Sequence, residues 1–205
     1  MSNSLDFGTV KQLKRDMVTE ISATLAFSAI QNNDKIGVIF FSDKIEKFIP
    51  PKKGRKHILY IIRELIDFKP ESTRTNIQCA IEYLTNVQKK RCTAFMLSDF
   101  IDDHDFQNAL TVANRKHDVV ALQVYDRRME ELPDVGLLKL RDAETGHEQW
   151  VDTSSRAVRN AHHAWWMQRQ EKLNGIFTHS NVDSVSVRTD QDYVKALLNL
   201  FAKRN

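Results

Sequence analysis

Four oxygen-bearing side chains stand at positions from which they could together hold a hard divalent cation. Ser2 and Ser4 lie two residues apart ahead of an expected helix, Thr75 precedes another helix, and Asp99 ends an apolar strand. Magnesium binds several oxygen ligands and usually keeps some of its water. Because three of the four side chains are neutral hydroxyls, the ion would retain positive charge and accept a carboxylate from a partner protein. We therefore expect a binding site rather than a catalytic one.

Two further acids are candidates for the outer shell of this site. Asp6 is close to the two serines in the sequence, and Asp126 ends a second apolar strand. Each candidate also has a simpler structural interpretation. Serine, threonine and aspartate at helix starts cap backbone N–H groups, and an acid in the first turn is favoured by the helix dipole. Only the combination of positions favours a metal site.

An alternation of strands and helices is expected to bring these residues together. The apolar runs 93–98 and 119–125 predict buried strands, and the segment 106–116 between them predicts a helix. Such crossover units build a parallel sheet, and ligands bind outside the carboxyl ends of its strands. Asp99 and Asp126 are therefore expected at one edge of the sheet.

The other elements complete an α/β pattern. We expect further helices at 9–30, 55–66, 76–87, 155–173 and 191–203, and further strands at 35–41, 44–48 and 182–188. The strands 35–41 and 44–48 form an antiparallel pair at one edge, ended by Pro50-Pro51, and 137–140 with 149–151 form a small inserted hairpin. The predicted fold is a doubly wound, mostly parallel sheet with helices on both faces and one antiparallel edge strand.

Composition points to an ordinary globular chain. At 205 residues it is long enough for one well-buried domain, here residues 1–205. The formal net charge of +3, with both signs mixed, gives no reason to expect a nucleic-acid partner. The apolar runs are strand-sized, so we expect neither a membrane segment nor a secretory signal. Cys79 and Cys92 lack a Cys-x-x-Cys pattern, which favours reduced thiols and a cytoplasmic location.

Several segments, taken in order, resemble one protein family. They include Ser-Asn-Ser-Leu-Asp-Phe-Gly-Thr at 2–9, Thr75-Asn76 and Leu-Ser-Asp-Phe at 97–100, together with 34–43, 50–55, 117–119, 132–136 and 142–146. From residue 2 onward the chain is similar to the von Willebrand factor A-like domain of a family of uncharacterised bacterial proteins. Members of that family are commonly associated with MoxR-type AAA+ ATPases.

The resemblance implies a metal-ion-dependent adhesion site at the carboxyl edge of the sheet. Ser2, Ser4, Thr75 and Asp99 match its ligands, with magnesium or another divalent cation as the cofactor and a MoxR-type ATPase or a client protein as the partner. In the family a strand leads into Asp-x-Ser-x-Ser, and here Met1 occupies the first x. We therefore expect the first central strand and the metal-binding Asp to precede residue 1, and metal binding by residues 1–205 alone to be weak or absent.

Other features of the sequence allow other interpretations. A magnesium-dependent phosphoryl-transfer or hydrolase enzyme could use Asp99 and Asp126, but the sequence has no glycine-rich phosphate loop and no Gly-x-Ser-x-Gly elbow. The basic run 52–57 is better explained as a solvated loop and helix start. His162-His163 and Trp165-Trp166 are assigned to packing, with Trp165 facing the core and Trp166 exposed.

Overall fold

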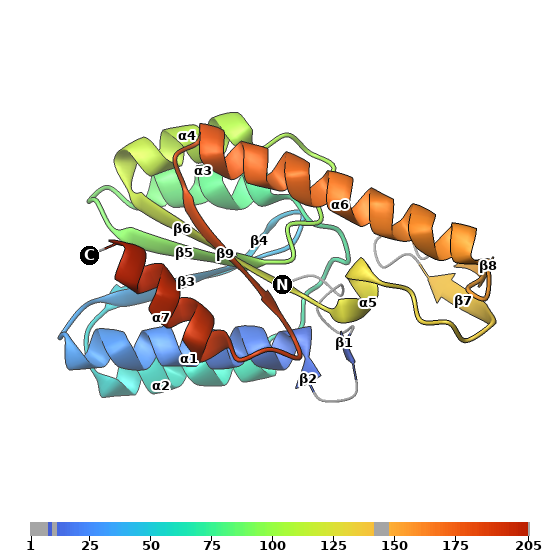
Figure 1. The fold of residues 1–205 in the computed structure, drawn as a ribbon. Helices are drawn as coiled ribbons and strands as arrows, with labels where there is room; N and C mark the ends of the chain where they lie inside the picture. Colours follow the sequence, from blue (N-terminus) through green and yellow to red (C-terminus); the bar gives the residue numbers. More distant parts are fainter. Residues whose placement is uncertain (1–7, 10–11, 142–147, 205) are drawn as a thin grey trace.

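The computed structural model describes residues 8–9, 12–141 and 148–204, and it has a mixed α/β fold (Figure 1). The strands are β1 (Gly8–Thr9), β2 (Gln12–Leu13), β3 (Ile36–Phe41), β4 (Ile45–Lys52), β5 (Thr93–Ser98), β6 (Asp118–Tyr125), β7 (Leu137–Arg141), β8 (Glu148–Asp152) and β9 (Asp183–Arg188). The helices are α1 (Lys14–Gln31), α2 (Arg55–Asp67), α3 (Ile77–Val87), α4 (Gln107–Lys116), α5 (Arg127–Glu130), α6 (Arg156–His179) and α7 (Tyr193–Arg204).

The centre of the fold is a parallel sheet with the strand order β5-β6-β9. Ser98 of β5 lies opposite Gln123 of β6, which in turn lies opposite Ser186 of β9. The chain passes from β5 to β6 through α4, and it enters β9 from α6. The predicted crossover units are thus confirmed.

Helices cover both faces of this sheet (Figure 1). Val119 and Ala121 of β6 join one hydrophobic cluster with residues of α3, α4 and α6. The alternate residues Val120, Leu122 and Val124 join a second cluster with α1 and α7. This alternation is the two-residue period of a strand, and it explains why β6 is apolar along nearly its whole length.

A second, antiparallel sheet consists of β3 and β4. β4 was predicted to end before Pro50-Pro51, but it continues through both prolines to Lys52, so that boundary was wrong. Among the described residues β4 pairs only with β3. A strand with one free side tolerates prolines, because their missing N–H groups need not bond a neighbour.

Two helix predictions also needed correction. α1 begins at Lys14 rather than at residue 9, because Gly8–Thr9 and Gln12–Leu13 pair as short antiparallel strands. α6 continues six residues beyond 173 to His179, because Ile176 and Phe177 extend its buried face.

The two neighbouring tryptophans of α6 face opposite to the prediction. Trp166 is 2% exposed and stacks on Tyr125 at a centroid distance of 5.1 Å, whereas Trp165 is 46% exposed. Trp166 shares the buried face of α6 with Leu173 and Phe177, at spacings of seven and eleven residues. The period of the helix therefore selects Trp166 for the interior.

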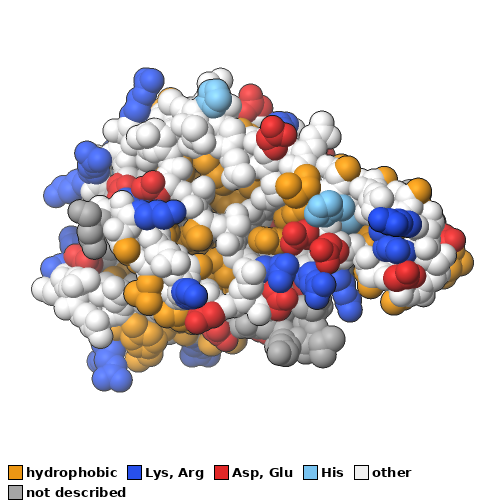
Figure 2. Space-filling model, in the orientation of Figure 1, with side chains coloured by type: hydrophobic (Ala, Val, Ile, Leu, Met, Phe, Trp, Pro, Cys, Tyr) orange, Lys and Arg blue, Asp and Glu red, His pale blue; other side chains and the backbone are white. Residues whose placement is uncertain are grey.

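The predicted hairpin is confirmed as β7 and β8, which lie beyond the sheet near the start of α6 (Figure 1). On the face that Figure 2 shows, acidic and basic side chains are intermingled. Within the described part of the chain, no helix is both long and apolar enough to span a membrane.

Candidate functional site

Three loops meet at the carboxyl edge of β3 and β5. Asn76 donates its backbone N–H to the carbonyl oxygen of Ser42, which follows β3, at 2.9 Å. Ile77 donates its N–H to Oδ2 of Asp102, in the loop after β5, at 2.6 Å. Thr75 precedes these two residues and is only 6% exposed. The start of α3 is therefore fixed between the ends of two strands.

Asp99 is buried directly after β5, with 3% of its surface exposed. Its Oδ1 atom accepts a hydrogen bond from the backbone N–H of Ile101 at 3.2 Å. Its Oδ2 atom lies 3.1 Å from Nζ of Lys14. The carboxylate is thus oriented by one backbone donor and neutralised by one buried cation.

The residue after Asp99 has an unusual backbone conformation. Phe100 has a φ of 56°, a region that side chains other than glycine rarely adopt, and its N–H bonds Oγ of Ser98 at 3.0 Å. Its ring is buried, with centroid distances of 5.1 Å to Phe177 and 6.3 Å to Phe106. Aromatic packing therefore stabilises the tight turn that directs the Asp99 side chain.

Lys14 is the site residue that sequence analysis missed. It is the first residue of α1, it is 2% exposed, and its ammonium also lies 3.6 Å from Sδ of Met129 in α5. The signal was present in the sequence, because Lys14 lies on the same helical stripe as Met17 and Ile21, which are apolar. A lysine on a buried helix face needs a counter-charge, and here that charge is Asp99.

A buried amide links Asp99 to the rest of the sheet. Gln123 of β6 is 2% exposed and donates from Nε2 to the backbone carbonyl of Asp99 at 3.2 Å. Its Oε1 atom accepts from Oγ of Ser186 in β9 at 2.7 Å. This polar row crosses the parallel sheet from the end of β5 to β9 and fixes the position of the Asp99 backbone.

Asp126, at the end of the neighbouring strand β6, is fully buried. Its Oδ1 atom accepts from the backbone N–H of Arg128 at 2.9 Å and so caps α5. Its Oδ2 atom accepts from Oγ1 of Thr189, the residue after β9, at 2.9 Å. These contacts give Asp126 a structural role at the same edge of the sheet as Asp99.

An exposed carboxylate also lies at this edge. Asp43 follows Ser42, and hydrogen bonds from the hydroxyls of Ser72 and Ser42 lower the pKa of Asp43, because they stabilise its charged form. The carboxyl edge therefore carries buried and exposed oxygen donors.

The predicted ligands are only partly within the described residues. Ser2, Ser4 and Asp6 lie outside them, whereas Thr75 and Asp99 lie in two loops that a hydrogen bond joins, since Ile77 after Thr75 donates to Asp102 after Asp99. A buried hydroxyl and a buried carboxylate are the hard oxygen donors that magnesium prefers, so they fit such an ion chemically. The described residues contain no cluster of three or more His, Cys, Asp or Glu side chains suited to a metal.

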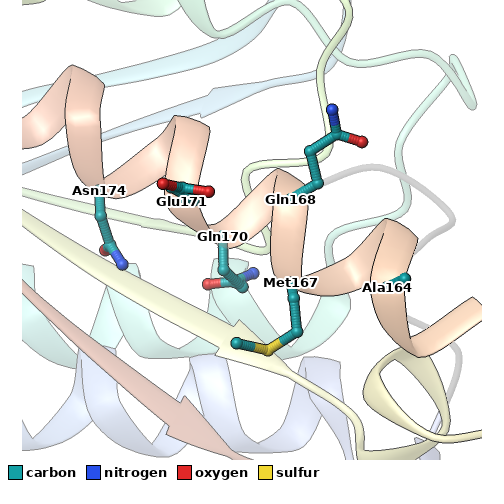
Figure 3. Close-up of a pocket in the computed structure, with 6 residues that line it drawn as sticks. All are labelled: Ala164, Met167, Gln168, Gln170, Glu171 and Asn174. Atoms are coloured by element: carbon teal, nitrogen blue, oxygen red, sulfur yellow. The ribbon is translucent and has the colours of Figure 1, made fainter.

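A separate surface pocket lies on α6 (Figure 3). It is lined by Ala164, Met167, Gln168, Gln170, Glu171 and Asn174, all from this one helix. One ionisable side chain among six lining residues gives the pocket little means of binding a metal. The carboxyl edge remains the candidate site.

Comparisons with known proteins place the chain among bacterial relatives. It is 29% identical over 211 residues to an uncharacterized protein of Mycobacterium tuberculosis and to one of Mycobacterium bovis, in alignments that cover the whole chain. The chain spans 65% of the length of these two relatives. It is also 28% identical over 163 residues to an uncharacterized protein of Mycobacterium avium, covering 76% of this chain and 93% of that one.

Two solved structures share the fold. One is the conserved hypothetical protein BatB from Bacteroides thetaiotaomicron, with a TM-score of 0.64 and 17% identity, covering 98% of this chain and 93% of that one. The other is an aerotolerance-related membrane protein from Bacteroides fragilis that carries multiple mutations to serines, with a TM-score of 0.65, 18% identity and coverages of 98% and 94%. Residues 1–172 match the family described as "Protein of unknown function DUF58", and the chain belongs to that family.

Proposed function

We propose that this chain is a non-enzymatic, metal-dependent protein-interaction domain. Its cation, magnesium or a similar hard ion, would be held by Ser2, Ser4, Thr75 and Asp99. Asp6 and Asp126 would contribute only through outer-shell contacts. The ion would complete its coordination shell with a carboxylate of the partner protein. The partner would be a MoxR-type AAA+ ATPase or one of its clients, as the sequence resemblance implies.

The observation that carries this proposal is the burial of Asp99 beside a cation at the carboxyl edge. The Asp99 side chain is 2% exposed, it is oriented by a left-handed turn, and its charge is balanced by Lys14. A buried carboxylate at a strand end is costly unless it has a cationic partner. Thr75 supplies a second buried oxygen at the same edge.

We also propose that β3 and β5 belong to one doubly wound sheet, joined by a further strand between them. Both are nearly as apolar as β6, yet most of their residues are only half-buried, whereas residues 119–124 of β6 are all buried. Half-burial of an apolar strand indicates that one of its sides is not covered.

Capture of a purified MoxR-type ATPase tests the proposed function. Because metal binding by residues 1–205 alone is expected to be weak, capture is measured at a high magnesium concentration. We expect capture there, loss of capture in a chelator, and at least a tenfold reduction for Asp99→Asn. Asp103→Asn is the matched control, because its side chain is 94% exposed in the same loop. Circular dichroism checks that both variants are folded.

Two results would contradict the proposed function. Capture that is unchanged by chelator and by Asp99→Asn would exclude metal-dependent binding. Magnesium-dependent turnover of a phosphoester would instead favour the alternative function, a phosphoryl-transfer or hydrolase enzyme, if Asp126→Asn abolishes that turnover.

A further inference from the structure

We propose that Lys14 is a built-in competitor of the metal ion at Asp99, so that a divalent cation binds only after the Lys14 ammonium leaves. This inference rests on the proposed metal-dependent function and names a residue that regulates the affinity of the same site.

The geometry places the ammonium where a cation would be held. Nζ of Lys14 lies 3.1 Å from Oδ2 of Asp99, and each side chain is 2% exposed. The other oxygen, Oδ1, is already engaged by the N–H of Ile101. The oxygen best placed to accept a new cation is therefore the one that Lys14 occupies.

Charge makes the two cations mutually exclusive. A divalent ion coordinated to Oδ2 and an ammonium on the same oxygen would stand within a few ångströms of each other in a water-poor environment, where repulsion is weakly screened. Without a metal, Lys14 neutralises Asp99 and allows the carboxylate to stay buried. When a metal is bound, the ion neutralises the Asp99 carboxylate, and the Lys14 ammonium no longer has a counter-charge.

Lys14 is also suited to leave. Among the residues that the structure describes, the ammonium has one further contact, with Sδ of Met129 at 3.6 Å, and a thioether is a weak acceptor. Lys14 is the first residue of α1, so a rotation of its long side chain need not disturb the helix interior. Departure of the ammonium would break its contact with Met129, so the surroundings of α5 would differ between the metal-bound and the metal-free protein.

Direct titration with magnesium, followed by calorimetry, tests the competition without any partner protein. Lys14→Met shortens the side chain by one atom and removes its charge, so we expect this variant to bind magnesium at least tenfold more tightly than the unaltered protein. Lys14→Arg keeps the charge and should bind no more tightly. Lys53→Met is the control, since Lys53 is exposed and remote in the sequence from the site.

Thermal melting gives a second readout that does not depend on measuring affinity. In chelator, Lys14→Met should melt at a lower temperature than the unaltered protein, because Asp99 is left buried and uncompensated. Magnesium should raise its melting temperature more than that of the unaltered protein. The double variant Lys14→Met with Asp99→Asn should melt higher than Lys14→Met in chelator and should not respond to magnesium.

The outcomes separate this inference from the proposed function. Equal magnesium affinity in the unaltered protein and Lys14→Met, lost on Asp99→Asn, would overturn the role of Lys14 and leave the metal site intact. If no variant binds magnesium, both proposals fall. If Lys14→Met folds only in magnesium, while the double variant folds without it, the competition is supported.

Discussion

His117 illustrates how one buried residue can make the fold sensitive to pH. It is fully buried before β6, its Nδ1 atom lies 3.6 Å from Sγ of Cys92, and its Nε2 atom has no hydrogen-bond partner within the described residues. Burial, with a smaller contribution from the positive charge of Lys116, lowers the pKa of His117 below its ordinary value of 6.5. The folded protein therefore holds this imidazole neutral.

A pH titration of stability tests this. Below pH 6.5 the unfolded chain binds the proton more readily than the folded one, so the free energy of unfolding should fall as the pH drops through 6.5 towards the lowered pKa. Above pH 6.5 the contribution is fully present. His117→Leu should show a shallower loss between pH 8 and pH 5.5 in urea unfolding. His179→Leu, at an exposed position, should follow the unaltered protein, and identical slopes for all three proteins would refute the prediction.

At the scale of single elements, the start of α3 depends on a side chain from a distant loop. The Asp102 carboxylate accepts from the N–H of Ile77 at 2.6 Å, and from the N–H and ring Nδ1 of His104 at 2.8 and 2.6 Å. We expect Asp102→Ala to lower the free energy of unfolding by about 2 kcal/mol, because a buried donor at a helix start loses its acceptor. Asp103→Ala, at a 94% exposed side chain, should change it by less than about 0.5 kcal/mol in the same denaturant titration.

Two glycines allow a matched comparison of strand and helix. A Cβ atom on Gly37 of β3 would lie 2.7 Å from the carbonyl oxygen of Ile49 and 2.9 Å from the nitrogen of Pro51, both in β4. Gly37→Ala should therefore destabilise the protein by about 1–3 kcal/mol. A Cβ atom on Gly175 of α6 meets no atom within 4 Å, so Gly175→Ala should stabilise it by about 0.5–1 kcal/mol. Chemical denaturation measures both, and a Gly37→Ala variant as stable as the unaltered protein would contradict the packing of β3 on β4.

Element types could be predicted because each leaves a local pattern in the sequence. The apolar runs of β5 and β6 and the striped α2 and α3 lie close to their expected positions. The extension of β4 through Pro50-Pro51 could not be predicted, since it depends on which strands pair with it. The two adjacent tryptophans do not by themselves reveal which one faces the core, but the spacing of Trp166 from the apolar Leu173 and Phe177 carries that information.

For the whole molecule, the separation of the β3-β4 sheet from the β5-β6-β9 sheet predicts that some strands open locally more easily than others. β6 is bonded to a neighbour on each side, whereas β3 and β5 each have one paired side among the described residues. Amides whose N–H groups lie on a paired and buried strand exchange only through extensive unfolding. As long as no further strand occupies the place proposed between β3 and β5, we expect hydrogen exchange to be at least tenfold slower for β6 amides than for those amides of β3 and β5 that face no partner strand among the described residues. Uniform protection across the three strands would mean that these second sides are already covered.

The candidate site required more than local patterns. Thr75 and Asp99 were identified because each stands at the boundary of an element, and boundaries can be read from a sequence. The pairing of Lys14 with Asp99 joins residues 85 positions apart, and that of Asp102 with Ile77 joins residues 25 apart. Such contacts exist only once α1 and α3 have docked on the sheet.

Gln123 has a consequence for how substitutions in this chain should be interpreted. Through this amide, the exposed Ser186 of β9 is connected to the peptide carbonyl of Asp99, so Gln123 alone lies between an exposed hydroxyl and the backbone of the buried Asp99. In a large-scale mutational survey, Ser186 would therefore group with buried positions despite its exposure. Surface accessibility alone would misjudge its tolerance to substitution.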